Sequence, residues 1–239
     1  QKECYSKLDY LLSDASLMLA NKEYTDAVNL LSRYLREHEK RHEAYALRAR
    51  VYYAMESYKN ALSDLDEAIS ISGRNAGYFK LRAQVRSALS QYAESISDYS
   101  RALDLNPTDL SLYVLRSEAL RKAGRYDESL ADLQTYMKYM GSSEQVLYSA
   151  AVAMYDKGDY MASLSFINRV LETNKTKPEY YLLRGNAYMN TRLPKYAVKD
   201  FGMALDIDNK LTEAWLNRGK ARLSLGDASG ACHDWQIAS

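Results

Sequence analysis

Several kinds of residue are scarce in this chain of 239 residues. It has two cysteines, Cys4 and Cys232, near opposite ends, which argues against a disulfide framework or a zinc site made of thiolates. Three prolines and ten glycines leave few points where a helix must break. No apolar run approaches the roughly 18 residues that cross a bilayer, so no membrane span is expected.

An excess of charge of either sign is also missing. The formal net charge is +1 and the pI is near 7.8, which indicates neither a nucleic-acid partner nor an anionic membrane surface. The first residue is Gln1 rather than methionine. Two compartments therefore stay open: the cytoplasm, or export with a removed signal peptide.

Amphipathic helical spacing is present nearly everywhere, and the pattern recurs with a period of about 34 residues. The stretches "YALRARVYYAMESYKNALSDLDEAI", "YVLRSEALRKAGRYDESLADLQTYM" and "YLLRGNAYMNTRLPKYAVKDFGMAL" begin at Tyr45, Tyr113 and Tyr181, each two periods after the last. Intermediate copies begin at Phe79, Leu147 and Trp215, and a weaker one at Leu11. The pattern predicts an all-α chain without strands.

A small residue keeps the repeat in register without a gap. It occupies the middle of each expected second helix, at Ala27, Ala61, Ser95, Ser129, Ser163, Ala197 and Ala231. Turns that often contain glycine separate two helices in each unit, as in "DKGDY". The register predicts one domain over residues 1–239, with repeats at about 8–41, 42–75, 76–109, 110–143, 144–177, 178–211 and 212–239.

These residues resemble the tetratricopeptide repeat (TPR) family, in particular bacterial-type repeats, over all seven units. Three departures are a unit-closing proline only at Pro107, arginine where the family has leucine, and Pro194 in the turn of the sixth unit. The resemblance implies an α-solenoid, a right-handed superhelix of antiparallel helix pairs. It also implies a non-catalytic protein–protein interaction scaffold without a cofactor, whose first helices line a concave groove.

A periodic arginine in the first helix has an aspartate sixteen residues later in the second helix of five units. The fifth unit has Ala150 and Phe166 at these positions and the first has Asp14 and Leu30, so the two residue types occur together or not at all. We therefore expect structural ion pairs between the two helices of a unit. The pairs are Arg48 with Asp64, Arg82 with Asp98, Arg116 with Asp132, Arg184 with Asp200, and Arg218 with Asp234.

The resemblance places a mixed set of polar, aromatic and charged residues in the groove. They are Arg50, Tyr53, Lys80, Gln84, Glu118, Arg121, Tyr148, Tyr155, Asn186, Met189, Asn190 and Lys220. Such a surface suits an extended peptide or a partner helix. One subfamily captures a C-terminal carboxylate, but Val114, Leu115 and Glu118 follow Lys80 and Gln84, so no such clamp is predicted.

The last unit ends at Ser239 without a polar capping helix. We expect the apolar end around Trp235 and Ile237 to pack on other protein, either sequence beyond the chain or a neighbouring molecule. Self-association through this end is one form of that expectation.

The stretch "HEKRH", His38 to His42, suggests a different function. It matches H-E-x-x-H, in which two histidines on one helical face bind zinc and a glutamate acts as general base. A zinc hydrolase with His38, Glu39 and His42 is therefore a remote alternative. The repeat register instead predicts a helix break near Glu39. A second alternative makes the chain the recruitment portion of a larger enzyme or of a secretion or transport assembly.

Overall fold

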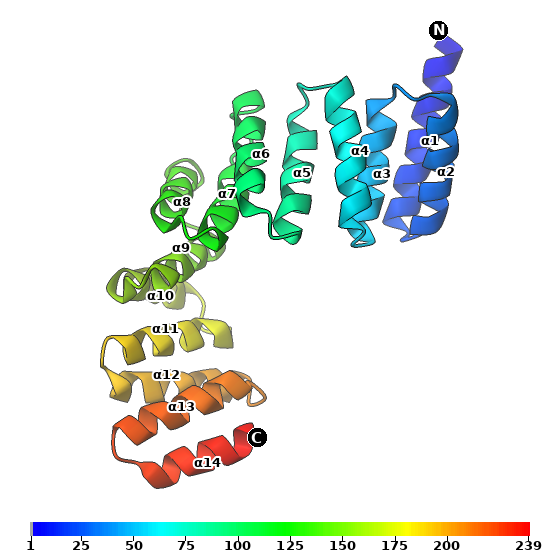
Figure 1. Cartoon of the computed structure of the whole chain (residues 1–239). Coiled ribbons are helices and arrows are strands. Elements are labelled where there is room, and N and C mark those ends of the chain that lie inside the picture. The colour runs from blue at the N-terminus through cyan, green and yellow to red at the C-terminus, as the bar shows by residue number, and fades with distance from the viewer. Residues whose placement is uncertain (1) are drawn as a thin grey trace. The chain divides into compact units, whose positions relative to one another are not determined.

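The computed structural model describes residues 2–239, with side chains from residue 10 onward, and this part of the chain is helical without strands (Figure 1). Its helices are α1 (Lys2–Ala20), α2 (Tyr24–Glu37), α3 (His42–Ala54), α4 (Tyr58–Ile71), α5 (Ala76–Ala88), α6 (Tyr92–Leu105), α7 (Ser111–Lys122), α8 (Tyr126–Met140), α9 (Glu144–Lys157), α10 (Tyr160–Thr173), α11 (Pro178–Asn190), α12 (Pro194–Ile207), α13 (Thr212–Ser224) and α14 (Ala228–Ala238).

The helix starts reproduce the sequence period. The even-numbered helices begin at residues 24, 58, 92, 126, 160, 194 and 228, one repeat period after another. Odd-numbered helices from α3 onward begin at or within one residue of the expected repeat boundaries. Consecutive helices such as α3 and α4 lie side by side as hairpins (Figure 1). The all-α solenoid predicted from the sequence is thus the observed architecture of paired helices.

A left-handed residue closes the turn inside each hairpin. Its φ lies between 57° and 88° at Lys22, Glu56, Ser90, Gly124, Gly158, Arg192 and Gly226, which again follow one another by one repeat period. Glycine takes this conformation without strain, and the other residue types pay a steric cost. The sequence suggested that Pro194 lies in the turn, but Pro194 does not lie there. It is the first residue of α12, where proline suits a helix because its missing N–H would have no helical partner.

Contacts divide the chain into two compact units, residues 1–123 and 124–239. The first unit contains α1 to α7 and the second contains α8 to α14. The boundary falls in the turn of the fourth expected repeat. The organisation as one seven-repeat domain therefore stays a prediction, and each unit is described by itself.

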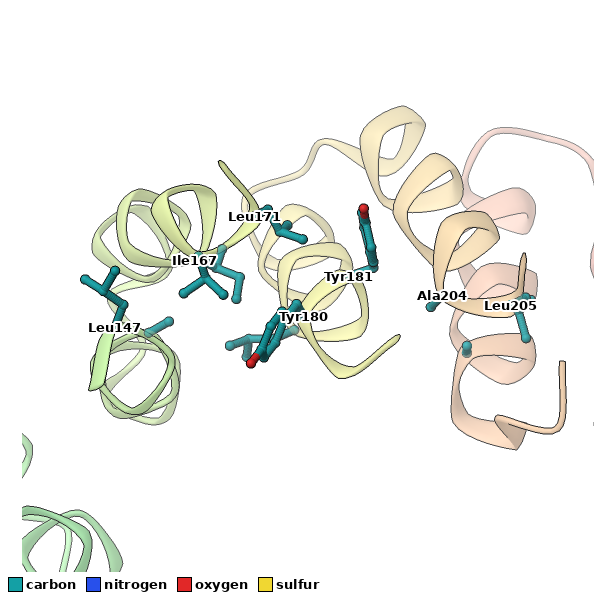
Figure 2. Packing of buried hydrophobic residues seen from close by; sticks show 11 residues of the cluster. Leu147, Ile167, Leu171, Tyr180, Tyr181, Ala204 and Leu205 are labelled. Carbon is teal, nitrogen blue, oxygen red and sulfur yellow. The ribbon is translucent and has the colours of Figure 1, made fainter. Parts of the chain in front are cut away.

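Each core lies between stacked hairpins. In the second unit, Leu147, Ile167, Leu171 and Tyr180 bring α9, α10 and α11 together (Figure 2). The small residues of the second helices allow this close approach, because all seven are 1% exposed or less: Ala27, Ala61, Ser95, Ser129, Ser163, Ala197 and Ala231.

Glycine is required at two first-helix positions. A Cβ added to Gly185 would lie 2.6 Å from Cε1 of Phe201, and one added to Gly219 would lie 2.3 Å from Nε1 of Trp235. The aromatic side chains of α12 and α14 therefore rest directly on the backbones of α11 and α13.

Candidate functional site

The recurring arginine and aspartate meet at the seam between the two helices of a hairpin. In four hairpins the arginine donates from Nε and Nη2 to the two oxygens of its aspartate, at 2.7–2.9 Å. These pairs are Arg48 with Asp64, Arg82 with Asp98, Arg184 with Asp200, and Arg218 with Asp234. The aspartates are at most 5% exposed, so this paired geometry compensates for their desolvation.

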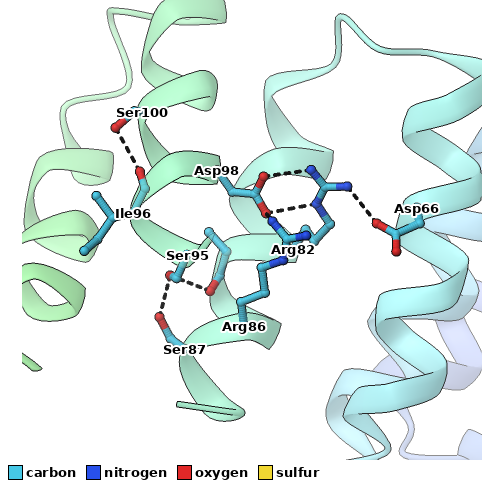
Figure 3. Close-up of polar contacts among 9 residues, drawn as sticks. Asp66, Arg82, Arg86, Ser87, Ser95, Ile96, Asp98 and Ser100 are labelled. Carbon is cyan, nitrogen blue, oxygen red and sulfur yellow. Dashed lines mark hydrogen bonds and ion pairs between the residues drawn. The ribbon is translucent and has the colours of Figure 1, made fainter. Parts of the chain in front are cut away.

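Three of these arginines, and also Arg116, contact the preceding hairpin, which the sequence interpretation missed. Nη1 of Arg82 donates to Asp66 of α4 at 2.7 Å, while Nε and Nη2 hold Asp98 of α6 (Figure 3). Equivalent contacts, each reaching back to the second helix of the preceding hairpin, join Arg48 to Ser32, Arg116 to Ser100 and Arg184 to Asn168. A polar residue two positions after the aspartate, such as Asp66 or Ser100, is the signal that could have predicted them.

These contacts occupy most of the hydrogen-bonding positions of the arginine side chains. The pKa of Arg48 is raised above its ordinary value, chiefly by its hydrogen bond to Asp64. For Arg82 and Arg184, burial lowers the pKa, but the bonded carboxylates outweigh it and the net shift is upward. A guanidinium with two or three filled hydrogen-bonding directions binds helices together and has little capacity left for an external anion.

The fifth expected pair spans the boundary of the two units. Arg116 belongs to the first unit and Asp132 to the second, so this pair stays a prediction. Ala150 and Phe166 replace the pair in the fifth hairpin, where Ala150 is buried and Phe166 packs against the apolar core.

The first helices of the first unit line an apolar hollow of about 360 Å³, called here the Tyr99 hollow. Its lining residues are Tyr53, Gln84, Ser87, Ala88, Tyr92, Tyr99, Leu115, Glu118, Ala119 and Lys122, from α3, α5, α6 and α7. Tyr99 is 2% exposed. Burial raises its pKa to about 12, although a hydrogen bond to Ser87 acts in the opposite direction. The Tyr99 phenol therefore stays neutral and contributes an apolar ring.

A second hollow of about 280 Å³ adjoins the first, because Gln84 lines both. This Arg50 hollow lies between α3 and α5 and is lined by Ala46, Arg50, Gly77, Tyr78, Lys80, Leu81 and Gln84. Lys80 donates to Asp109 at 2.9 Å and to Ser111 at 3.0 Å. The bonds from Ser111 and Lys80 hold the pKa of Asp109 below its usual range, so this lysine is already paired with an anion.

The second unit has a more polar hollow of about 270 Å³ on its own first helices, called here the Asn186 hollow. It is lined by Tyr155, Asn186, Met189, Asn190, Glu213, Asn217 and Lys220. Asn217 donates to Oδ1 of Asn186 at 3.0 Å, and Lys220 donates to Asn217 at 3.2 Å. Asn190 donates to the Tyr155 hydroxyl at 3.2 Å. The carboxamides thus bond mainly to their neighbours.

Ten of the twelve predicted groove residues line one of these three hollows. The other two are Arg121, which donates to Glu118, and Tyr148, whose ring lies 4.9 Å from that of Tyr180. The sequence interpretation missed Tyr99, Leu115 and Lys122, and in the second unit Glu213 and Asn217. Lys122 and Asn217 lie one helical turn from predicted residues, a spacing that could have included them.

The two histidines of HEKRH do not share a helix. Helix α2 ends at Glu37 and α3 begins at His42, so the break falls around Glu39 as the register predicts. The ring of His38 packs 4.6 Å from Tyr34, whereas Nδ1 of His42 lies 2.8 Å from the hydroxyl of Tyr78. The helical arrangement that the zinc hydrolase hypothesis requires is therefore not formed.

Glu39 instead lines a third hollow of the first unit, about 620 Å³ in volume, together with Lys40, Arg48 and Glu67. Its charges are mixed, and Arg48 is occupied by Asp64 and Ser32. Among the described residues, no group of three or more histidine, cysteine, aspartate or glutamate side chains is placed to hold a metal ion. None of the described helices is long and apolar enough to cross a membrane.

Stacked helix hairpins with an ion-paired seam define an α-solenoid, a class of interaction scaffold. Two family models match the chain: "Anaphase-promoting complex, cyclosome, subunit 3" over residues 20–102, and "Tetratricopeptide repeat" over residues 80–139. Together with the solved structures below, these matches identify the chain as a tetratricopeptide repeat protein. The matches end at residue 139, so the count of seven repeats stays a prediction.

Curated relatives match only in part. Hsc70-interacting protein 1 of Drosophila melanogaster is 25% identical over 92 residues, 38% of this chain and 24% of that protein. Human serine/threonine-protein phosphatase 5 is 28% identical over 78 residues, 33% of this chain and 16% of that protein. The chain thus spans about a quarter or less of the length of these two relatives.

Solved structures share the fold over most or nearly all of the chain. A TPR protein from Parabacteroides merdae has a TM-score of 0.77 at 18% identity, covering 96% of this chain and 91% of its own. The C-terminal part of a TPR protein from Cytophaga hutchinsonii has a TM-score of 0.76 at 19% identity, covering 95% and 93%. YrrB, described as a TPR protein with an unusual peptide-binding site, has a TM-score of 0.63 at 17% identity, covering 77% and 95%. This fold supports a role as a protein–protein interaction scaffold.

Proposed function

We propose that the chain binds an extended peptide or a helix of a partner protein on its first-helix faces, and that it has no catalytic role of its own. One observation carries the proposal. Three consecutive first helices, α3, α5 and α7, line the adjoining Tyr99 and Arg50 hollows. A surface hollowed across several repeats suits a ligand that extends along the repeats, rather than a compact small molecule.

The chemistry of the hollows supports the same proposal. Tyr53 and Tyr92, which are partly exposed, and the buried Tyr99 all line the Tyr99 hollow, so a bound side chain would meet aromatic surface. Aromatic side chains supply a large apolar area at little conformational cost, which makes them frequent energetic centres of protein interfaces. Gln84 and Glu118 add polar groups at the rim, where they can orient a ligand.

A second candidate function is recruitment within a larger enzyme or assembly. The partial matches favour it, because one relative is named as a phosphatase and the matched segment covers 16% of that protein. In such an assembly these repeats would hold a partner while a separate domain carried out the reaction. The two functions use the same first-helix faces and differ in what the scaffold is attached to.

Affinity capture with the full chain tests the proposed function. Ala88 is exposed at the end of α5 and lines the Tyr99 hollow, so Ala88→Phe should fill the hollow without disturbing the core. Ala93→Phe is the matched control, because Ala93 is exposed on α6 outside the lining. We expect mass spectrometry to find partners that Ala88→Phe loses and Ala93→Phe keeps. Equal capture by all three proteins would contradict binding in this hollow.

A further inference from the structure

The Tyr99 hollow is built for a bulky apolar side chain. Tyr53, Tyr99 and Leu115 line it with buried or half-buried apolar surface, whereas its charged lining residues, Glu118 and Lys122, are exposed. Its volume of about 360 Å³ is at the lower end of the roughly 300–1,000 Å³ typical of ligand pockets. One phenylalanine, tryptophan, leucine or methionine side chain of a partner fits this description better than a polar group, because a polar group would be desolvated there.

The charges around the two hollows are unbalanced in one direction. Glu118 is paired with Arg121, and Asp109 with Lys80, so both carboxylates are already neutralised. Arg50 lines one hollow and Lys122 the other. Both are exposed, and within the described part of the chain neither has a hydrogen-bond or ion-pair partner. Two cations thus remain available on either side of Gln84, and they would attract a negatively charged ligand.

Resting on the proposed function, we infer that the partner is an acidic peptide segment. It places one bulky apolar side chain in the Tyr99 hollow and carboxylate side chains near Arg50 and Lys122. The apolar contact supplies most of the affinity, whereas the exposed cations select acidic sequences and speed association. The inference fits a segment internal to a partner protein, because Lys80, the lysine that lines the Arg50 hollow, is held by Asp109 and Ser111.

Selection from a random 12-residue peptide library displayed on phage tests this inference with the full chain. Every displayed peptide carries a linker at its C-terminus, so a free carboxylate contributes nothing. The test variant is the double substitution Arg50→Glu with Lys122→Glu. Its matched control is Lys59→Glu with Arg74→Glu, which changes the net charge equally at exposed positions outside both hollows. Circular dichroism establishes that each variant is folded.

Enrichment of peptides with a bulky apolar residue flanked by aspartate or glutamate is the expected result. Fluorescence anisotropy should show that the charge-reversed variant binds the most enriched peptide about tenfold more weakly or worse, while the control variant keeps its affinity. The wild-type affinity should also fall with added salt. Ala88→Phe should abolish binding of the same peptide.

Two other outcomes would overturn the inference, and binding to Ala88→Phe distinguishes one from the other. Peptides that Ala88→Phe releases, but that are not acidic or are insensitive to the charge reversal, would contradict the acidic partner and leave the proposed groove function standing. Peptides that bind Ala88→Phe as well as wild type, or no enrichment at all, would contradict both the inference and peptide binding in this hollow.

Discussion

The first helices of the two units follow the same repeat period, but the side chains at equivalent positions differ in chemistry. Arg50, Gln84 and Glu118 occupy the frame position that Asn186 and Lys220 occupy in the second unit. The first unit combines an apolar hollow with two cations that have no partner among the described residues, whereas the second combines carboxamides that bond to one another. The position of a residue in the repeat therefore determines where its side chain lies, and the neighbouring side chains determine whether it is available to a ligand.

Each unit has arginine–aspartate pairs between the helices of its hairpins, and breaking such a pair should have the largest effect in both units. Asp98→Ala in the first unit and Asp200→Ala in the second each leave a partly buried arginine without its carboxylate. We expect each to lower the free energy of unfolding by about 3–5 kcal/mol. The loss for Asp98 should be the larger, since Asp98 also accepts a bond from Arg86 at 2.7 Å.

Denaturant unfolding of the full chain, with hydrogen exchange to locate the loss, measures both effects. Asp206→Ala is the matched control because Asp206 is exposed on α12, and it should change stability by less than about 0.5 kcal/mol. Losses below about 1 kcal/mol for Asp98→Ala and Asp200→Ala would mean that the seam is not what holds the hairpins together.

Close packing in the second unit depends on Gly185. Adding one methyl group there should have the next largest effect on stability. Gly185→Ala drives a Cβ into the ring of Phe201, so a loss of about 1–3 kcal/mol is expected. Gly202→Ala in the neighbouring helix is a sharp contrast, because its Cβ would meet only Nη1 of Arg218 at 3.8 Å. There alanine should stabilise the helix by up to about 1 kcal/mol. The midpoint temperatures of thermal unfolding of the two variants should therefore shift in opposite directions.

Asn186 and Arg50 occupy the same position of the repeat, so replacing each by alanine tests the difference between the two units directly. Asn186→Ala removes the acceptor of the bond from Asn217, and we expect a loss of about 0.5–1.5 kcal/mol in the free energy of unfolding. Arg50→Ala removes a side chain without a partner among the described residues, so stability should stay within about 0.5 kcal/mol. Equal losses at both positions would contradict the difference between the two faces.

Acid should act on the second unit through a carboxylate at the junction of two hairpins. Lys177, Tyr180 and Asn174 hydrogen-bond Glu144 and hold its pKa at about 2, below its ordinary value. Because the folded-state pKa is depressed, this contribution to stability is present above the unfolded pKa of about 4.3 and is lost as pH falls towards 2. One equivalent position in the first unit is His42, which contacts the Tyr78 hydroxyl through Nδ1 and lies 3.4 Å from the carboxylate of Glu43 through Nε2.

Glu144→Gln should therefore flatten the pH dependence of stability between about pH 4.5 and pH 2. Hydrogen exchange of α9 and α11 at pH 5 and pH 3 would measure this small effect. The exposed Glu179, replaced by glutamine, serves as control. An unchanged pH dependence in Glu144→Gln would show that the cluster contributes nothing to acid sensitivity.

Sequence periodicity predicted the hairpins well because small residues and turn residues act locally. The break around Glu39 and the helix starts follow from the register alone. The contacts of Arg48, Arg82, Arg116 and Arg184 with the preceding hairpin were not predicted, because Asp66 and Arg82, for example, belong to different hairpins that only stacking brings together. The interior of the Tyr99 hollow was missed for the same reason. Tyr99 occupies a buried core position of α6, and it lines the hollow only because α5 and α7 both pack on that helix.

Mapping the bound peptide on the full chain tests the central claim most directly. Hydrogen–deuterium exchange would be measured with and without the peptide most enriched from the random library. The account predicts slower exchange in α3, α5 and α7, around Arg50, Gln84 and Lys122, with α9, α11 and α13 unchanged. Protection confined to the Asn186 hollow, or to the second helices α2 and α4, would contradict it.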